Sequence, residues 1–345
     1  MDGETDPRPD SGDRRQRAVT METVGRIAGV SQVTVSRALS DPSKVSAKTL
    51  QKIHEAIEAT GFVPNAIAGA LASNKSKLIT ALVPSITNIV YSSMIRSFSL
   101  RMRDAGYQIL LSETGFDPED EEQAIAAHLS RRPDAILLTG IHHSAQARRM
   151  LLASGLPVVE VWDFTETPID ICVGFRHAET GFAAADFAVA QGYGQAAVIA
   201  AGDERARRRK DAFRTRFEEK TGTTVCELNF EAGATLARGR EGLSSLLDEM
   251  GFRTGVVSCS SDILAHGVIV EAKARGLRIP EDIAVIGFGD QEFAADTEPS
   301  ITTIKVDREA FGRSAADAIL ARINGGGHRV DAIDLGFEII RRRSA

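Results

Sequence analysis

The stretch from Val19 to Asn65 constrains the fold of this chain more than any other part of the sequence. Thr20 and Ser31 can each cap a short helix, the first ending at Gly29 and the second running from Gln32 to Leu39. Two short helices joined by a glycine-containing turn form a helix-turn-helix, a unit that lays its second helix in the major groove of DNA. The sequence therefore predicts a DNA-binding unit close to its amino terminus.

The helical period divides these two helices into an inward and an outward face. The inward face is expected to hold the apolar side chains Val24, Ile27, Ala28, Val30, Val35 and Leu39. The outward face of the second helix then holds Gln32, Val33, Ser36 and Arg37. Short or planar hydrogen-bonding side chains with one apolar contact are the types that read base edges.

A third helix completes the unit. Ser46 can cap it, and Gly61 followed by Phe62 reads as a glycine cap with its hydrophobic contact at the other end. Its apolar face is predicted to hold Leu50, Ile53 and Ile57. An ordinary three-helix structural unit is the alternative interpretation, since helix-turn-helix shapes also occur without DNA.

An ordered series of motifs runs through this stretch: Val30-Ser-x-x-Thr-Val-Ser-Arg37, Val45-Ser-x-x-Thr49, Gly61-Phe-x-Pro-Asn65 and Leu71-Ala72. The series resembles the DNA-binding headpiece of the lactose-repressor (LacI/GalR) family. The resemblance implies specific binding to a near-palindromic operator by a homodimer. The residues expected to contact DNA are Thr20, Ser31, Gln32, Val33, Thr34, Ser36, Arg37, Ser46, Asn65, Ala68, Leu71 and Ala72.

The segment from Asn65 to Ser73 is too short and too glycine-interrupted to be a stable isolated helix. The family resemblance implies that it folds as a hinge helix on operator DNA, with Leu71 wedged into a minor-groove base step. Gly25 is a departure from the family, which usually has alanine there. It is expected to loosen the first helix by up to about 1 kcal/mol without removing a contact.

The charge distribution agrees with a DNA-binding end. The whole chain has a net charge of −6, but the stretch from Arg14 to Lys77 has ten Lys/Arg and four Asp/Glu, so the rest carries −12. A basic headpiece on an acidic body is expected when only one end meets phosphate. The polar residues 1–18 predict a disordered arm without a signal peptide. Three scattered cysteines and no apolar run of about 20 residues indicate a cytoplasmic protein, away from any membrane.

From Leu78 onward, short apolar runs alternate with amphipathic stretches, which predicts parallel sheets with right-handed crossovers. The predicted strands are Leu78–Val83, Gln108–Ser112, Ala135–Leu138, Val158–Val161, Ala196–Ala200, Gly255–Ser258 and Ile283–Gly287. The predicted helices are Ser92–Ala105, Pro118–Arg131, Ala145–Ser154, Ala178–Gln191, Arg205–Lys220, Ala234–Glu249 and Ile263–Arg275.

This run is too long for one sheet, so the expected fold is an all-α helix-turn-helix headpiece plus an α/β core of two doubly wound parallel-sheet lobes. The resemblance implies a periplasmic-binding-protein-like core with three chain crossings, near Trp162–Gly174, Ser300–Ile304 and Val330–Asp334. The expected domains are residues 19–64, a linker 65–76 and a core 77–345. Within the core, lobe 1 is about 77–173 and 304–331, and lobe 2 is about 174–303 and 332–341.

Ligands of such lobes bind at the carboxyl ends of the strands. Arg209 and Asp262 match, by resemblance, the family's effector-binding arginine and an acid that binds sugar hydroxyls, although Asp262 can also simply cap its helix. Ser261 stands where the family usually has asparagine. The residues expected to bind the effector are Ser85, Asn88, Tyr91, Glu113, Trp162, Asp163, Arg205, Arg209, Asp262 and Phe288.

Two other patterns invite functions that we discount. Gly192-Tyr-Gly194 imitates a dinucleotide fingerprint, but it follows a predicted helix and precedes a strand, the reverse of the required order. His142-His143 lacks a matched partner cluster, so both side chains are expected at the surface rather than on a metal. We therefore expect no metal, no cofactor and no catalytic residues, and the chain is not expected to be an enzyme.

Several segments are similar to the gluconate-operon repressors within the family: Leu82–Asn88, Ile169–Phe175, Asp203–Arg205 and Ile333–Phe337. This resemblance implies a transcriptional repressor of carbohydrate metabolism, controlled by a small sugar acid such as gluconate bound between the lobes. The alternative functions are a sugar-acid-binding protein or an enzyme of carbohydrate metabolism without specific operator binding. Neither alternative accounts for the helix-turn-helix.

Overall fold

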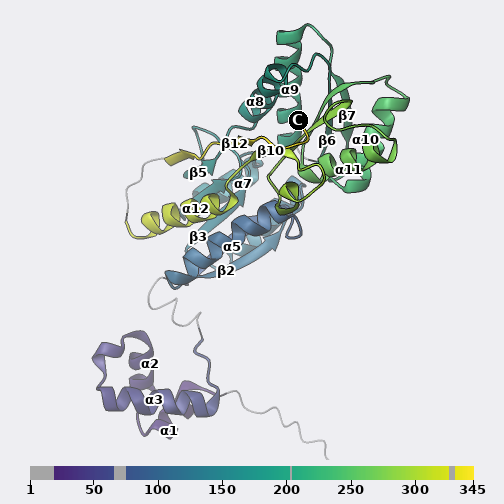
Figure 1. The fold of residues 1–345 in the computed structure, drawn as a ribbon. Coiled ribbons are helices and arrows are strands. Elements are labelled where there is room, and N and C mark those ends of the chain that lie inside the picture. The colour runs from purple at the N-terminus through teal and green to yellow at the C-terminus, as the bar shows by residue number, and fades with distance from the viewer. Residues whose placement is uncertain (1–18, 66–74, 203, 326–330) are drawn as a thin grey trace, which may run out of the picture. The chain divides into compact units, whose positions relative to one another are not determined.

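The computed structural model describes residues 19–65, 75–202, 204–325 and 331–345 (Figure 1). The chain forms two compact units, Met1–Ser76 and Lys77–Ala345. The predictions for the arm 1–18 and for linker residues 66–74 lie outside the described residues. Among those described, no helix is long and apolar enough to cross a membrane.

The first unit contains three helices and a short 3-10 turn, with each predicted cap in place. Thr20, Ser31 and Ser46 each precede a helix and accept a hydrogen bond from the backbone three residues on. Gly61 ends the last helix in the left-handed conformation, with φ +63°. The elements are α1 (Met21–Ala28), α2 (Gln32–Ser40), η1 (Pro42–Lys44) and α3 (Ala47–Thr60).

The core of this unit differs from the predicted inward set at one position. Ile27 is 50% exposed, so its prediction as a core residue was wrong. The eight-residue α1 buries only the narrow stripe Val24, Gly25 and Ala28, and Ile27 lies beside that stripe. Ala38 of α2, which was not in the predicted set, is buried in the cluster. The buried apolar cluster is Val24, Ala28, Val35, Ala38, Ile53, Ala56 and Phe62.

The second unit contains two six-stranded sheets. The first, here called sheet A, has the order β11-β5-β4-β3-β1-β2 and is parallel throughout. Its strands are β1 (Leu78–Val83), β2 (Gln108–Glu113), β3 (Ala135–Thr139), β4 (Val158–Val161), β5 (Ile171–Gly174) and β11 (Asp331–Asp334).

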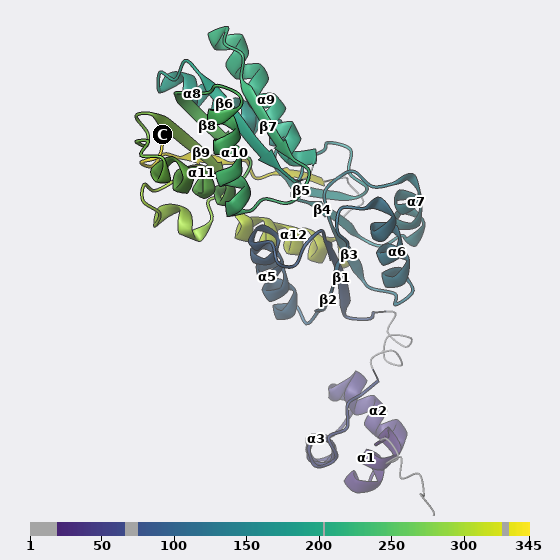
Figure 2. The ribbon, with the colours of Figure 1, turned by 90° about the vertical axis from the view of Figure 1, so that its right-hand side faces the viewer.

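Helices cover both faces of sheet A, and we call this layered assembly lobe 1 (Figure 2). Alternate strand residues point to opposite faces. Ile79 and Ala81 therefore join the apolar cluster of α5 (Ile89–Asp104) and α12 (Arg308–Ile323). Leu82 joins the cluster on the other face, under α6 (Pro118–Leu129) and α7 (Ala145–Ser154).

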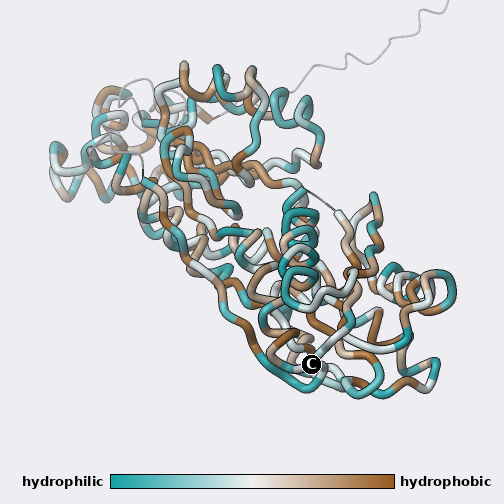
Figure 3. Tube along the Cα trace, turned by 90° about the horizontal axis from the view of Figure 1, so that it is seen from above, coloured by the Kyte–Doolittle hydropathy of each residue, from teal (hydrophilic) through white to brown (hydrophobic). Residues whose placement is uncertain are grey.

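Sheet B, with the order β12-β10-β9-β8-β6-β7, builds lobe 2 in the same way. Its strands are β6 (Ala196–Ala201), β7 (Cys226–Phe230), β8 (Gly255–Cys259), β9 (Ile283–Phe288), β10 (Thr302–Lys305) and β12 (Glu338–Ile340). Helices α8 (His177–Ala190) and α9 (Glu204–Thr221) cover one face, and α10 (Leu236–Asp248) and α11 (Asp262–Ala274) the other. The helical coils alternate between hydrophilic and hydrophobic stretches, as amphipathic helices do (Figure 3).

Several elements were not predicted, namely β5, β7, β10, β11, β12, α12 and the 3-10 turn η2 (Glu292–Ala295). Strand β12 runs antiparallel to β10, so sheet B is not entirely parallel. The chain passes between the sheets after Gly174, after Lys305 and after Asp334. Each passage lies at or just past the end of the range in which a crossing was expected.

Candidate functional site

The outward row of α2 is fully displayed to solvent. Gln32, Val33, Ser36 and Arg37 are all exposed, and Val33 exposes 65% of its surface. An apolar side chain this exposed contributes little to the core of its own unit. A row of two hydrogen-bonding groups, one apolar group and one cation can contact base edges and methyl groups in a major groove.

The predicted helix caps have a structural role of their own. The Thr34 N–H donates to Ser31 Oγ at 3.2 Å, and the two hydroxyl oxygens lie 2.9 Å apart. Thr20 and Ser46 each accept a backbone N–H at 3.3 Å. Helix N-termini of this kind can bind phosphate groups. Contact of these residues with the DNA phosphates stays a prediction.

The predicted contacts at the end of the headpiece are described only in part. Asn65 is exposed. The positions of Ala68, Leu71 and Ala72 lie outside the described residues, so the hinge contacts stay a prediction.

Gly25 has a closer packing role than the sequence indicated. Its carbonyl accepts the Val30 N–H at 2.8 Å, and a Cβ on Gly25 would lie 2.8 Å from the Val30 carbonyl oxygen. Because the atoms nearest to this Cβ belong to the backbone of residues 30–32, a side chain at Gly25 would require the turn to shift. Glycine therefore lets α1 lie this close to the turn before α2.

The predicted effector residues of lobe 1 follow its strands, but only some of them converge. Asn88 lies in the loop after β1, where its Oδ1 accepts the Val90 N–H at 3.0 Å and caps α5. Ser85 lies in the same loop and contacts Thr87. Glu113 is exposed at the end of β2, an edge strand of sheet A.

An aromatic cluster connects the two lobes beside these loops. Trp162 is 4% exposed, and its ring centroid lies 6.1 Å from that of Tyr91 and 5.5 Å from that of Phe175. The ring centroid of Phe175 in turn lies 6.1 Å from that of Phe288, the last residue of β9 in lobe 2. The predicted residues Tyr91, Trp162 and Phe288 therefore belong to one continuous apolar contact.

Trp162 adopts an unusual backbone conformation, with φ +70°. A bulky residue with positive φ is strained, and such strain gathers at functional sites. The carbonyl of Trp162 accepts a hydrogen bond from His177 Nε2 at 2.9 Å. The turn at Trp162 brings Asp163 to the carboxyl end of β4, where ligands of parallel sheets bind.

Helix α9 presents Arg205 and Arg209 to this cluster. Arg205 is 7% exposed and donates from Nη2 to the Tyr91 hydroxyl of lobe 1 at 2.9 Å. Arg209 donates to the Ser260 carbonyl at 3.1 Å and lies 3.9 Å above the Phe288 ring. Both predicted arginines therefore lie where the two lobes meet.

His177 is neutral in this setting. Burial is the main cause that lowers its pKa well below the usual value, with the nearby charge of Arg209 next. Arg209 Nη1 lies 2.9 Å from His177 Nδ1 and can only donate. The ring proton therefore lies on Nε2, which donates to the Trp162 carbonyl.

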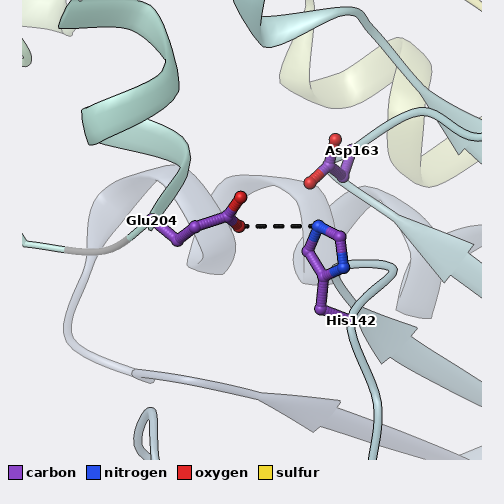
Figure 4. A group of neighbouring side chains, drawn as sticks. All are labelled: His142, Asp163 and Glu204. Carbon is purple, nitrogen blue, oxygen red and sulfur yellow. Dashed lines mark ion pairs between the residues drawn. The ribbon is translucent and has the colours of Figure 1, made fainter. Parts of the chain in front are cut away.

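A charged group spans the two lobes beside the aromatic cluster. Figure 4 shows His142 and Asp163 from loops of lobe 1 facing Glu204 at the start of α9, with the His142–Glu204 ion pair at 3.6 Å. Arg208, one turn along α9, binds both carboxylates. Its Nη1 lies 3.3 Å from Asp163 Oδ1, its Nη2 contacts Asp163 Oδ2, and its Nε lies 2.9 Å from Glu204.

These three side chains also have the composition of a metal site. His142, Asp163 and Glu204 each offer a ligand atom within 4.8 Å of the others. The guanidinium of Arg208 already binds both carboxylates, and its positive charge opposes a second cation there. We therefore interpret the group as an ion-pair bridge between the lobes.

Asp262 does not cap α11, so one of its two sequence interpretations was wrong. Ser261, rather than Asp262, is the N-cap of α11. The buried Asp262 carboxylate accepts the Thr303 hydroxyl at 2.5 Å and the Gln291 N–H at 2.7 Å. Burial raises the pKa of Asp262 to about 6, against the lowering effect of these two hydrogen bonds. Asp262 thus ties α11 to β10 and to the loop after β9, and its binding of ligand stays a prediction.

The expectation that His142 and His143 both lie at the surface was wrong for His143. Its side chain is 1% exposed, with Nδ1 3.0 Å from Glu121 and Nε2 3.4 Å from Glu160. Glu160 is fully buried in β4. Buried carboxylates need a counter-charge, and His143 supplies it.

Three residues that build the interlobe site were not predicted from the sequence: Phe175, His177 and Arg208. Arg208 belongs to a run of basic residues, 205–210, from which only Arg205 and Arg209 were predicted to bind the effector. The helical spacing offered a signal, since positions 205, 208 and 209 share one face of a helix.

Comparison with known proteins agrees with this geometry. A family model for bacterial regulatory proteins, lacI family, matches residues 20–65, and one for a periplasmic binding protein-like domain matches residues 185–345. The chain is 36% identical to the HTH-type transcriptional regulator GntR of Pseudomonas aeruginosa, over 97% of this chain and 98% of the relative. It is 30% identical to GntR of Escherichia coli, over 94% and 98%.

Solved structures share the architecture. A LacI family regulator from Silicibacter pomeroyi superimposes with a TM-score of 0.88 at 31% identity, covering 94% of this chain and 99% of that one. The regulator GntR from Chromobacterium violaceum gives 0.73 at 30% identity, covering 77% and 98%. The lac repressor bound to operator, at 24% identity and a TM-score of 0.83 over 95% and 99%, shares the fold.

The relatives match nearly the whole chain, and the matched regions include both the helix-turn-helix and the two-lobed core. The predicted fold class is therefore confirmed. The chain belongs to the LacI family of bacterial regulatory proteins, which are DNA-binding transcription regulators and not enzymes.

Proposed function

We propose that this regulator is a repressor that binds a near-palindromic operator as a homodimer and is controlled by a small sugar acid such as gluconate. The ligand binds between the lobes of the core, residues 77–345. The headpiece, residues 19–64, binds DNA, and the linker 65–76 joins it to the core and forms a hinge helix on the operator. The similarity to two GntR regulators over nearly their full length supports membership of the gluconate-operon repressor subgroup. A second relative from Escherichia coli, the regulator IdnR, is 25% identical over 94% of this chain.

One observation carries the choice of an acid. Arg205, Arg208 and Arg209 all reach the junction of the lobes from one helix. A guanidinium binds a carboxylate through two parallel hydrogen bonds, whereas a neutral ligand that displaces its partners leaves buried charge uncompensated. The ligand acts by favouring one arrangement of the lobes, and only to the extent of its differential affinity for two states.

Calorimetric titration of the full chain tests the ligand class. Gluconate and related sugar acids are expected to bind more tightly than neutral pentoses, hexoses or purines, because only the acids compensate the arginines. A protein that binds a neutral sugar or a purine but none of the acids contradicts the proposed effector. The family assignment is unaffected by that result.

The DNA contact is tested at Arg37. Arg37→Ala is expected to weaken operator binding by about 1–3 kcal/mol, because the exposed guanidinium is lost from the outward row of α2. Fluorescence anisotropy at fixed salt measures the change. Arg26→Ala is the matched control, since Arg26 is an exposed arginine of α1 outside that row. Equal operator affinity of the wild type and Arg37→Ala removes Arg37 from the proposed contacts.

A further inference from the structure

The ion pair between Arg208 and Asp163 has the geometry of a ligand contact. Two guanidinium nitrogens of Arg208 face the two carboxylate oxygens of Asp163 across the lobes. This is the two-pronged arrangement in which arginine binds a free carboxylate. Asp163 therefore occupies the position that the carboxylate of a ligand would take.

The two partners differ in accessibility. The Arg208 side chain is 31% exposed, whereas that of Asp163 is 2% exposed. Arg205 and Arg209 are held within the aromatic cluster, the first against Tyr91 and the second over Phe288. Arg208 thus combines solvent access with a carboxylate partner from the opposite lobe.

We propose that Arg208 binds the carboxylate of the effector, and that Asp163 binds the Arg208 guanidinium when no effector is present. The inference rests on the proposed function. It assigns the ligand carboxylate to Arg208 and the ligand hydroxyl groups to Asp163. When the ligand carboxylate takes Arg208, the buried Asp163 loses its charged partner and must gain other donors. Its Oδ1 already accepts the Phe164 N–H at 2.8 Å, and hydroxyl groups of the ligand supply the rest.

This exchange selects a polyhydroxylated monocarboxylate over simpler ligands. A neutral polyol offers donors to Asp163 but no anion to Arg208. A plain carboxylate neutralises Arg208 but leaves a buried carboxylate short of hydrogen bonds, which is costly. Only a molecule with both groups satisfies both residues.

The interlobe position gives the exchange a consequence for regulation. Asp163 belongs to lobe 1 and Arg208 to lobe 2, and His142 and Glu204 continue the same bridge (Figure 4). The ligand thus replaces a direct contact between the lobes with one that passes through itself. The lobes then close on the ligand rather than on each other.

Calorimetry with three six-carbon probes tests the inference on the full chain: gluconate, sorbitol and hexanoate. The wild type is expected to bind gluconate at least 10-fold more tightly than either of the others. Arg208→Gln is expected to weaken gluconate binding roughly 10- to 100-fold. Arg207→Gln is the matched control, because Arg207 is the exposed neighbour on the same helix.

Asp163→Asn tests the exchange itself. Without the competing carboxylate of Asp163, Arg208 is expected to bind hexanoate more tightly than in the wild type. Gluconate is expected to lose affinity in the same variant, because an amide is a weaker acceptor for its hydroxyls than a carboxylate. A structural role of Asp163 alone would weaken both ligands together.

The outcomes separate the two proposals. If the wild type binds gluconate and Arg208→Gln binds it equally well, the role of Arg208 is refuted while the effector class stands. If the wild type binds none of the sugar acids, both fall. If Arg208→Gln does not fold, Arg208→Lys decides the question, since it keeps a positive charge beside Asp163 but loses the two-pronged donor. Unchanged gluconate affinity in the lysine variant overturns the inference.

Discussion

Replacement of His143 by leucine is expected to lower the free energy of unfolding of the core unit by about 3–5 kcal/mol at pH 7. The imidazole lies between Glu121 and Glu160, with its side chain 1% exposed. Glu160 lies on β4 within sheet A and also accepts the Ile169 N–H at 2.6 Å. Leucine would leave the buried Glu160 carboxylate without its counter-charge. Urea unfolding monitored by circular dichroism measures the loss.

The same cluster makes stability depend on pH. Burial alone lowers the pKa of His143, but hydrogen bonds and charges from Glu121 and Glu160 outweigh it and raise the pKa to about 9. An unfolded histidine titrates near 6.5, so the folded state binds the proton more tightly. The stabilisation, about 3 kcal/mol, is complete below about pH 6.5 and disappears as the pH rises through about 9.

Two variants control this prediction. His142→Leu alters the neighbouring histidine, whose side chain is 66% exposed, and is expected to cost less than about 1 kcal/mol. The double variant His143→Leu with Glu160→Gln removes the uncompensated charge and is expected to recover part of the loss. Equal stability of His143→Leu and the wild type, or a wild-type stability that rises between pH 6.5 and 9, contradicts a charged His143.

The headpiece was predictable from the sequence because its determinants are local. Ser31 needs only the backbone N–H of Thr34, three residues away, to begin α2, and Gly61 needs only its own left-handed conformation to end α3. Helical spacing then assigns most of the core. Ile27 was predicted wrongly because an apolar residue at the border of a narrow buried stripe can be either buried or exposed.

The interlobe site was only partly predictable, because its contacts join distant segments. Arg208 and Asp163 are 45 residues apart in sequence, and His143 and Glu121 are 22 apart. Helical spacing places positions 205, 208 and 209 on one face of a helix, but no local pattern shows that this face meets the opposite lobe. The family resemblance selected Arg209, whose guanidinium the structure places against His177 and Phe288.

Helix α12 was missed for a different physical reason. Half of its buried residues are small, namely Gly312, Ala315 and Ala316, and a Cβ on Gly312 would lie 2.3 Å from the Met94 carbonyl oxygen of α5. Such positions add little to a hydrophobic pattern. The edge strands β11 and β12 were missed because they are short and carry few buried side chains.

The second large effect is expected at Ser344, whose side chain closes a seam in lobe 2. Its hydroxyl is fully buried, donates to the Val285 carbonyl at 2.6 Å and accepts the Thr302 N–H at 2.8 Å. The Ser344 carbonyl also accepts the Val285 N–H at 2.7 Å. The residue therefore joins β9 to the start of β10 through three hydrogen bonds.

Ser344→Ala is expected to destabilise the core unit by about 2–4 kcal/mol, because it leaves a buried carbonyl and a buried N–H without their partner. Urea unfolding measures the change against Arg343→Ala. That neighbour is 69% exposed and pairs with a Glu298 that is 66% exposed, so its loss is expected to cost less than about 1 kcal/mol. If the two variants lose the same stability, water reaches the seam and replaces the hydroxyl. A clear excess for Ser344→Ala means that the β9–β10 seam is dry, and that the chain after β12 is an integral part of lobe 2.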